Sequence, residues 1–73
     1  MHKSQIKFLL DFFQSIQKKH IEDISIRIET HSNGFEIAIG DTCCYSFDEK
    51  TSEDTATEQI YEIENCVKRL ENK

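Results

Sequence analysis

Alternating apolar residues on both sides of an Asn-Gly pair constrain the fold of this chain more than any other feature. Residues 24–30 read ISIRIET, so isoleucine occupies every second position from 24 to 28. Alternation with a period of two predicts a β-strand that buries one face. The pair Asn33-Gly34 is a strong signal for a tight hairpin turn, and residues 35–40 alternate again. The sequence therefore predicts an antiparallel hairpin of strands 24–30 and 35–40.

The position of the turn determines which residues face each other across this hairpin. A two-residue turn at Asn33-Gly34 brings the apolar faces of the two strands together. The predicted pairs are Ile28 with Ile39 and Thr30 with Ile37 on one face, and His31 with Glu36 and Glu29 with Ala38 on the other.

A third strand is predicted at residues 43–47, and the length of the loop before it has two alternatives. A two-residue loop at Gly40-Asp41 would pair Ile37 with Cys44 and turn Tyr45 outward. A three-residue loop that includes Thr42 places every large apolar side chain on one face of the sheet, so it is favoured. Its pairs are Ile39 with Cys43, Ile37 with Tyr45 and Phe35 with Phe47.

Two amphipathic helices flank the strands. In residues 4–19 the apolar side chains recur at spacings of three and four, and Ser4 is the predicted cap. In residues 53–71 the spacing is again four, three, four and three, with Thr51 or Ser52 as the cap. The predicted apolar stripes are Ile6, Leu9, Phe13 and Ile16 in the first helix and Ala56, Ile60, Ile63, Val67 and Leu70 in the second.

These elements predict one α+β domain, residues 1–73, with the order α-β-β-β-α. Two helices would pack on one face of a three-stranded antiparallel sheet, and the other face would be polar and hydrated. A domain of 73 residues buries only about 60% of the surface that its unfolded chain exposes. A deep enclosed site is difficult to build at that size, so we expect the protein to act through its outer surface.

The charge is concentrated in the second half of the chain. The net charge is −5, and residues 48–64 alone contain seven acids and one base, a net charge of −6. Lys and Arg drive binding to phosphates, so this half is not expected to bind nucleic acid or an anionic membrane. A protein with a basic surface is the expected partner. A nucleic-acid binder that uses Lys3, Lys7, Lys18 and Lys19 of the first helix remains an alternative.

The second helix carries the predicted partner-binding residues. Asp54, Glu58 and Glu62 follow one another at steps of four, so they form one ridge opposite the apolar stripe. The alternative is a solvated helix face whose first-turn acids stabilise the helix dipole. The predicted binding surface consists of this ridge with Tyr61, Glu53 and the acids of the preceding loop, Asp48 and Glu49.

Phe8 and Phe12 form a second candidate surface on the first helix. Phe8 lies about 100° from the centre of the apolar stripe, and Phe12 lies at its edge. If exposed, the two rings form an apolar patch of the kind that often marks a partner or dimer interface. A structural or regulatory homodimer is therefore the alternative function.

No cofactor, metal site or catalytic set is predicted. Cys43 and Cys66 are expected to be small core residues and Cys44 an exposed thiol, and their spacing does not match that of zinc ligands. His2, His20 and His31 are not expected to share a metal. An odd number of cysteines and the lack of an apolar run of about 20 residues favour a soluble cytoplasmic protein. Without a catalytic set, and with only Gly34 and Gly40 for a phosphate loop, the protein is not expected to be an enzyme.

The chain resembles two groups of proteins. Its α-β-β-β-α order resembles that of double-stranded RNA-binding domains, which contact phosphates through lysines at the start of their second helix. Residues 52–58 read SEDTATE and contain no base, so the RNA-binding motif is absent. In size, acidity and helix-sheet architecture the chain resembles phage or mobile-element inhibitors such as the anti-CRISPR proteins. That resemblance implies a protein that occludes a nucleic-acid-binding surface.

Overall fold

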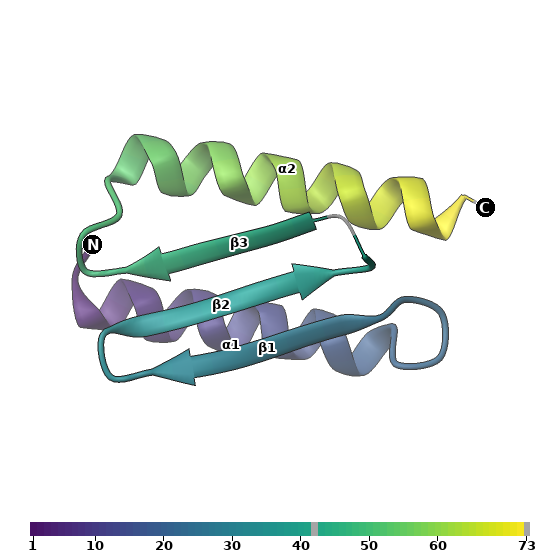
Figure 1. The fold of residues 1–73 in the computed structure, drawn as a ribbon, viewed down its shortest axis with the longest axis horizontal. Helices are drawn as coiled ribbons and strands as arrows, with labels where there is room; N and C mark the ends of the chain where they lie inside the picture. The colour runs from purple at the N-terminus through teal and green to yellow at the C-terminus, as the bar shows by residue number, and fades with distance from the viewer. Residues whose placement is uncertain (42, 73) are drawn as a thin grey trace.

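The computed structural model describes residues 1–41 and 43–72 and confirms the predicted fold class. The elements follow the order α-β-β-β-α (Figure 1). They are α1 (Lys3–Lys19), β1 (Ile26–His31), β2 (Gly34–Ile39), β3 (Cys43–Asp48) and α2 (Glu53–Glu71). The predicted first helix and first strand began at residues 4 and 24, whereas α1 begins at Lys3 and β1 at Ile26.

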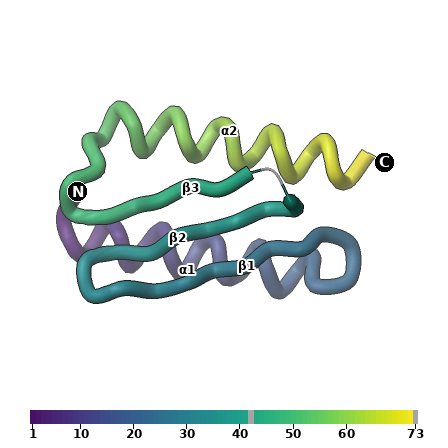
Figure 2. Tube along the Cα trace, viewed as in Figure 1, coloured from purple at the N-terminus to yellow at the C-terminus, as the bar shows by residue number. Residues whose placement is uncertain are grey.

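The domain has two layers, a sheet and a pair of helices. The antiparallel sheet has the strand order β1-β2-β3. Helix α1 packs over β1 and β2, and α2 packs over β2 and β3. The two helices cover the same face of the sheet and run in the same direction, as the traces in Figures 1 and 2 show. The uncovered face is polar, with Arg27, Glu29, Cys44 and Ser46 exposed.

Three phenylalanine rings form the centre of the core. Phe13 comes from α1, Phe35 from β2 and Phe47 from β3, and none is more than 1% exposed. Phe35 and Phe47 stack with their ring centroids 5.2 Å apart, and Phe13 lies 5.7 Å from Phe47 and 6.1 Å from Phe35. The apolar faces predicted for all three strands therefore meet the stripe of α1.

The predicted register of the first hairpin is wrong by two residues. Its two-residue turn is Ser32-Asn33, so Ile28 pairs with Ile37 and Ile26 with Ile39. His31 lies opposite Gly34 instead of Glu36, although its Nε2 remains 3.6 Å from Glu36 Oε1 along the diagonal. A shift of two residues leaves every side chain on its original face, because the strand period is two. The apolar pattern therefore cannot distinguish the two registers.

Gly34 is required by strand packing and not by the hairpin turn. It begins β2 and pairs with Asp48 of β3. A Cβ atom on Gly34 would lie 2.0 Å from the carbonyl oxygen of Phe47 and 2.7 Å from the Cα of Asp48. Only a residue without a side chain permits this approach of the two backbones.

The register of β2 and β3 agrees with the favoured alternative. Phe35 pairs with Phe47, Ile37 with Tyr45 and Ile39 with Cys43. Gly40 follows β2 with a φ of 62°, a conformation that glycine adopts without strain. Thr42, the last residue of the predicted loop, lies outside the described residues.

The two helix caps differ in how well the sequence predicted them. Ser52 caps α2 as expected, because its Oγ accepts a hydrogen bond of 3.1 Å from the N–H of Thr55. Ser4 does not cap α1: His2 occupies that position, and its N–H donates to Oε1 of Gln5 at 3.0 Å. Helix α1 therefore begins one residue earlier than predicted.

Candidate protein-binding surface

The acidic ridge of α2 lies on the solvent side of the domain. Thr57 and Glu53 point toward α1, and Gln59 points toward the sheet edge, where its Nε2 donates to the carbonyl oxygen of Ser46 at 3.0 Å. This rotation of α2 leaves the ridge residues Asp54, Glu58 and Glu62 exposed. The structure thus brings together the three carboxylates that the spacing predicted to share one face.

None of the three ridge carboxylates is neutralised within the part of the chain that the structure describes. The ion pairs of residues 1–41 and 43–72 join Lys3 to Glu49, His20 to Asp23 and Glu71, and His31 to Glu36. Asp54, Glu58 and Glu62 take part in none of them. Like charges four residues apart on a helix cost a few tenths of a kcal/mol per pair, so Glu58 and Glu62 do not help the isolated domain to fold, whereas Asp54 in the first turn also stabilises the helix dipole.

Tyr61 adds an aromatic ring to this face. Its side chain is 64% exposed. The rotation of about 100° per residue places it some 60° around α2 from the middle of the ridge. Tyrosine is a frequent anchor in protein interfaces because it combines a large apolar ring with a hydrogen-bonding hydroxyl. The ridge and Tyr61 therefore form one continuous candidate surface.

The carboxylates of Asp48 and Glu49, where β3 leads into the loop that precedes α2, already have partners within the domain. The Asp48 carboxylate accepts hydrogen bonds from the Lys50 N–H at 2.8 Å and the Thr51 hydroxyl at 3.3 Å. Oε1 of Glu49 lies 4.0 Å from Nζ of Lys3. Asp48 therefore shapes the turn, and Glu49 is partly neutralised. The predicted binding residues divide into an unpaired group on α2 and a structural group in the loop.

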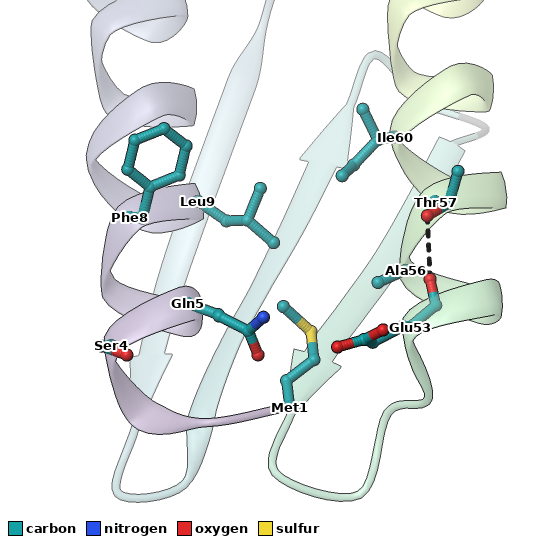
Figure 3. A pocket seen from close by; sticks show the side chains of 9 residues that line it. All are labelled: Met1, Ser4, Gln5, Phe8, Leu9, Glu53, Ala56, Thr57 and Ile60. Atoms are coloured by element: carbon teal, nitrogen blue, oxygen red, sulfur yellow. Dashed lines mark hydrogen bonds between the residues drawn. The ribbon is translucent and has the colours of Figure 1, made fainter.

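An apolar groove separates the two helices (Figure 3). Leu9 and Ile60 point toward each other across it, and Met1 lies between the helices at one end. The groove has a volume of about 470 Å³. Its walls consist of Met1, Ser4, Gln5, Phe8 and Leu9 on one side and Glu53, Ala56, Thr57 and Ile60 on the other.

Polar contacts join α1 to α2 and to the loop before α2 at both ends of the helix pair. At the N-terminal ends, the ammonium group of Met1 donates to the carbonyl oxygens of Glu49 and Thr51 at 3.1 and 3.0 Å. At the C-terminal ends, Nε2 of buried His20 lies 3.4 Å from Oε1 of Glu71. The two helices are therefore joined at both ends, and the groove lies between their N-terminal halves.

Phe8 and Phe12 are both exposed, as the alternative prediction of a homodimer requires. Phe8 is 71% exposed and forms part of the α1 wall of the groove. Phe12 is 43% exposed and packs against Phe13, with the ring centroids 5.4 Å apart. The groove thus extends the apolar patch of α1 toward Glu53 on α2. An apolar surface beside unpaired acids suits a partner that presents both apolar and basic side chains.

A cluster of sulfur and oxygen atoms lies between α2 and β3, away from this groove. The guanidinium of Arg69 donates to Sγ of Cys66 at 3.3 Å, and Cys43 lines the same pocket as Cys66 and is close enough to affect its pKa. Burial raises the pKa of the Cys66 thiol, the contact with Cys43 raises it further, and Arg69 lowers it. Burial and a hydrogen bond to Cys66 also raise the pKa of Tyr45 above its usual range.

Several of these features could not have been found in the sequence. The groove requires the distance and rotation of two helices that are 33 residues apart in the chain. Likewise, the proximity of Cys43 and Cys66 depends on the distance and rotation of α2 relative to β3. The sequence did identify both cysteines as core residues, and Cys66 is buried while Cys43 is half-buried.

The fold and this surface define a small α+β domain with an acidic helix face beside an apolar groove. Comparisons with models of protein families, with curated proteins and with solved structures found no match. In residues 1–41 and 43–72, no three His, Cys, Asp or Glu side chains converge as metal ligands would. The helices of the same residues include none that is long and apolar enough to cross a membrane.

Proposed function

We propose that this protein is a small acidic binding module that docks on a basic surface of another protein. One observation carries the proposal: Asp54, Glu58 and Glu62 form an exposed ridge, none of them has an ion-pair partner in the described chain, and Tyr61 lies beside them. The groove between α1 and α2 would accept an apolar side chain of the partner next to Glu53.

The proposed mechanism is electrostatic attraction followed by steric occlusion. Unpaired carboxylates speed the encounter with a basic surface, and they lose their mutual repulsion when Lys or Arg side chains approach. A domain of this size covers a nucleic-acid-binding surface without any chemical step. An inhibitor of this kind, similar in action to anti-CRISPR proteins, is the function that we propose. Binding should weaken steeply as salt is added, because exposed charges are screened.

Reversing two ridge charges tests the proposal. We expect Glu58→Lys/Glu62→Lys to weaken the partner complex at least about 10-fold, because each lysine replaces an attraction by a repulsion. The partner is first recovered by affinity capture with the unmodified protein and identified by mass spectrometry. The dissociation constant of the purified pair is then measured by calorimetry at low and high salt.

A matched control distinguishes the effect of where the charges lie from the effect of the total charge. Glu22→Lys/Glu29→Lys reverses two exposed acids that lie outside α2. Each reversal adds two positive charges, so both double variants carry a net charge of −1 instead of −5. The control should bind nearly as well as the unmodified protein. Equal losses in both variants, or no loss in the ridge variant, would contradict a role for the ridge.

A homodimer joined through Phe8 and Phe12 is the second candidate function. It is favoured by the exposure of two neighbouring aromatic rings on α1. Two copies that each carry a charge of −5 repel each other, so this dimer should strengthen with added salt, opposite to the behaviour of a complex with a basic partner.

Sedimentation at micromolar concentration distinguishes the two candidates. If the proposed binding module is correct, we expect a monomer whose sedimentation coefficient does not change in the variant Phe8→Ser, because Phe8 is exposed in the monomer and its loss costs little stability. A tight dimer that is lost with Phe8→Ser but retained with Asp54→Lys would instead support the homodimer.

A further inference from the structure

Two cysteines from different layers of the domain face one pocket. Cys43 begins β3 on the face of the sheet that the helices cover, and Cys66 lies on the buried side of α2 with 3% exposure. Both line a pocket of about 380 Å³ that is formed by the end of β2, the start of β3 and the last turns of α2. The other lining residues are Ile39, Gly40, Asp41, Arg69 and Leu70.

The two thiols differ in accessibility and in their partners. Cys43 is half-buried, so it is the more accessible of the two cysteines in the pocket. Cys66 is buried and receives the guanidinium hydrogen bond of Arg69 at 3.3 Å. Burial raises the pKa of the Cys66 thiol, and the guanidinium of Arg69 offsets part of this effect by favouring the thiolate, which is the reactive form of cysteine. The geometry thus provides an attacking thiol and a second thiol that is in contact with it.

We propose that Cys43 and Cys66 form a two-thiol site that reacts with a low-molecular-weight disulfide such as glutathione disulfide. The product is an intrachain disulfide that links β3 to α2. This inference does not depend on the proposed binding function, because the site lies on the other side of α2 from the groove.

The reaction consists of two thiol–disulfide exchanges. The Cys43 thiolate attacks one sulfur of glutathione disulfide, the S–S bond breaks, and the first glutathione leaves as a thiolate that takes up a proton. The Cys66 thiolate then attacks the Cys43 sulfur of the mixed disulfide and displaces the second glutathione. Two protein thiols are oxidised to one disulfide and one glutathione disulfide is reduced to two thiols, so the protons and electrons balance.

The third cysteine provides an internal control. Cys44 is exposed on the polar face of the sheet, where it pairs with Ala38. Its side chain points away from the pocket because successive residues of a strand face opposite sides. It should form a mixed disulfide with glutathione that Cys66 cannot resolve. Replacing it by serine removes this side reaction and leaves the proposed pair in place.

The experiment uses the full chain with Cys44→Ser, treated with glutathione disulfide at pH 8. We expect the intact mass to fall by two hydrogen atoms and both remaining cysteines to resist alkylation after denaturation. The disulfide should raise the midpoint of thermal unfolding by on the order of 10 °C, because it restricts the unfolded chain. Arg69→Gln should slow ring closure several-fold at neutral pH and less at alkaline pH, where Cys66 ionises without help.

Two further variants test the order of the steps. With Cys66→Ser, we expect one stable glutathione adduct on Cys43, because no second thiol can displace it. With Cys43→Ser, Cys66 should react much more slowly because it is buried. The proposal is overturned if the Cys44→Ser protein retains two alkylatable thiols after treatment, if its disulfides join separate chains, or if Cys66 reacts faster than Cys43.

Discussion

Replacing Phe47 by alanine is expected to lower the free energy of unfolding by about 3–5 kcal/mol. Phe47 is 0% exposed, and its ring contacts both Phe13 and Phe35. Alanine would leave a cavity where α1, β2 and β3 meet, and the remaining rings cannot fill it without leaving their own contacts. A domain of 73 residues has a total stability of roughly 4–11 kcal/mol, so the variant should lose a large part of it and unfold at a much lower urea concentration.

The measurement is urea unfolding followed by circular dichroism, with Phe8→Ala as the matched control. Both changes remove a phenylalanine ring, but Phe8 is 71% exposed. The control should alter the free energy of unfolding by no more than about 0.5 kcal/mol. A similar loss in both variants would show that Phe8 is buried in solution, for example in a dimer. A Phe47→Ala protein with unchanged stability would contradict the three-ring core.

Replacing Gly34 by alanine is expected to destabilise the sheet by about 3 kcal/mol or more. The added Cβ would lie 2.0 Å from the Phe47 carbonyl oxygen, so the backbones of β2 and β3 must separate. Because the contacting atoms belong to a backbone, no change of rotamer relieves the collision. For a domain of this size, such a loss lowers the midpoint of thermal unfolding by about 12–24 °C.

Gly40→Ala is the control for this prediction. Gly40 has a φ of 62°, so alanine there costs about 1–2 kcal/mol of backbone strain. The added Cβ would meet only the Cδ1 of Leu70, at 3.8 Å. Gly34→Ala should therefore be the more harmful change, although Gly34 does not lie in the left-handed region. The reverse order would indicate that β2 and β3 do not approach as closely as described.

The two helices present opposite charges to solvent, and this bears on the choice of partner. The lysines at positions 3, 7 and 18 lie within about 60° of one another on α1, and Lys3 is close to Glu49. The α2 ridge has no corresponding base in the described chain. Under the proposed function these acids meet a basic protein, because they would repel the phosphates of a nucleic acid.

The local sequence was sufficient to predict a structural feature wherever only one arrangement suited all the side chains involved. The three-residue loop after β2 was predictable because the shorter loop would have turned Tyr45 outward. For the loop, one alternative buried the apolar groups and the other exposed them. The cap of α2 was predicted to be Thr51 or Ser52, and the structure shows that it is Ser52, directly before the amphipathic run.

Local sequence failed where two arrangements bury the same residues. The Asn33-Gly34 pair suggested a turn, but a register shifted by two positions keeps the same face buried. In the observed register Gly34 belongs to β2 and not to the turn, and it approaches the backbone of β3 at Asp48, 14 residues further along the chain. Such a contact leaves no periodic signal in the sequence.

By itself, the sequence determined the order of the elements, the buried faces of the strands and helices, and the acidic ridge of α2, because each depends on a local period of two or 3.6 residues. Only the tertiary structure decided the hairpin register, the open groove beside Glu53 and the contact of Cys43 with Cys66. These depend on the distance and rotation between elements, which many side chains set together.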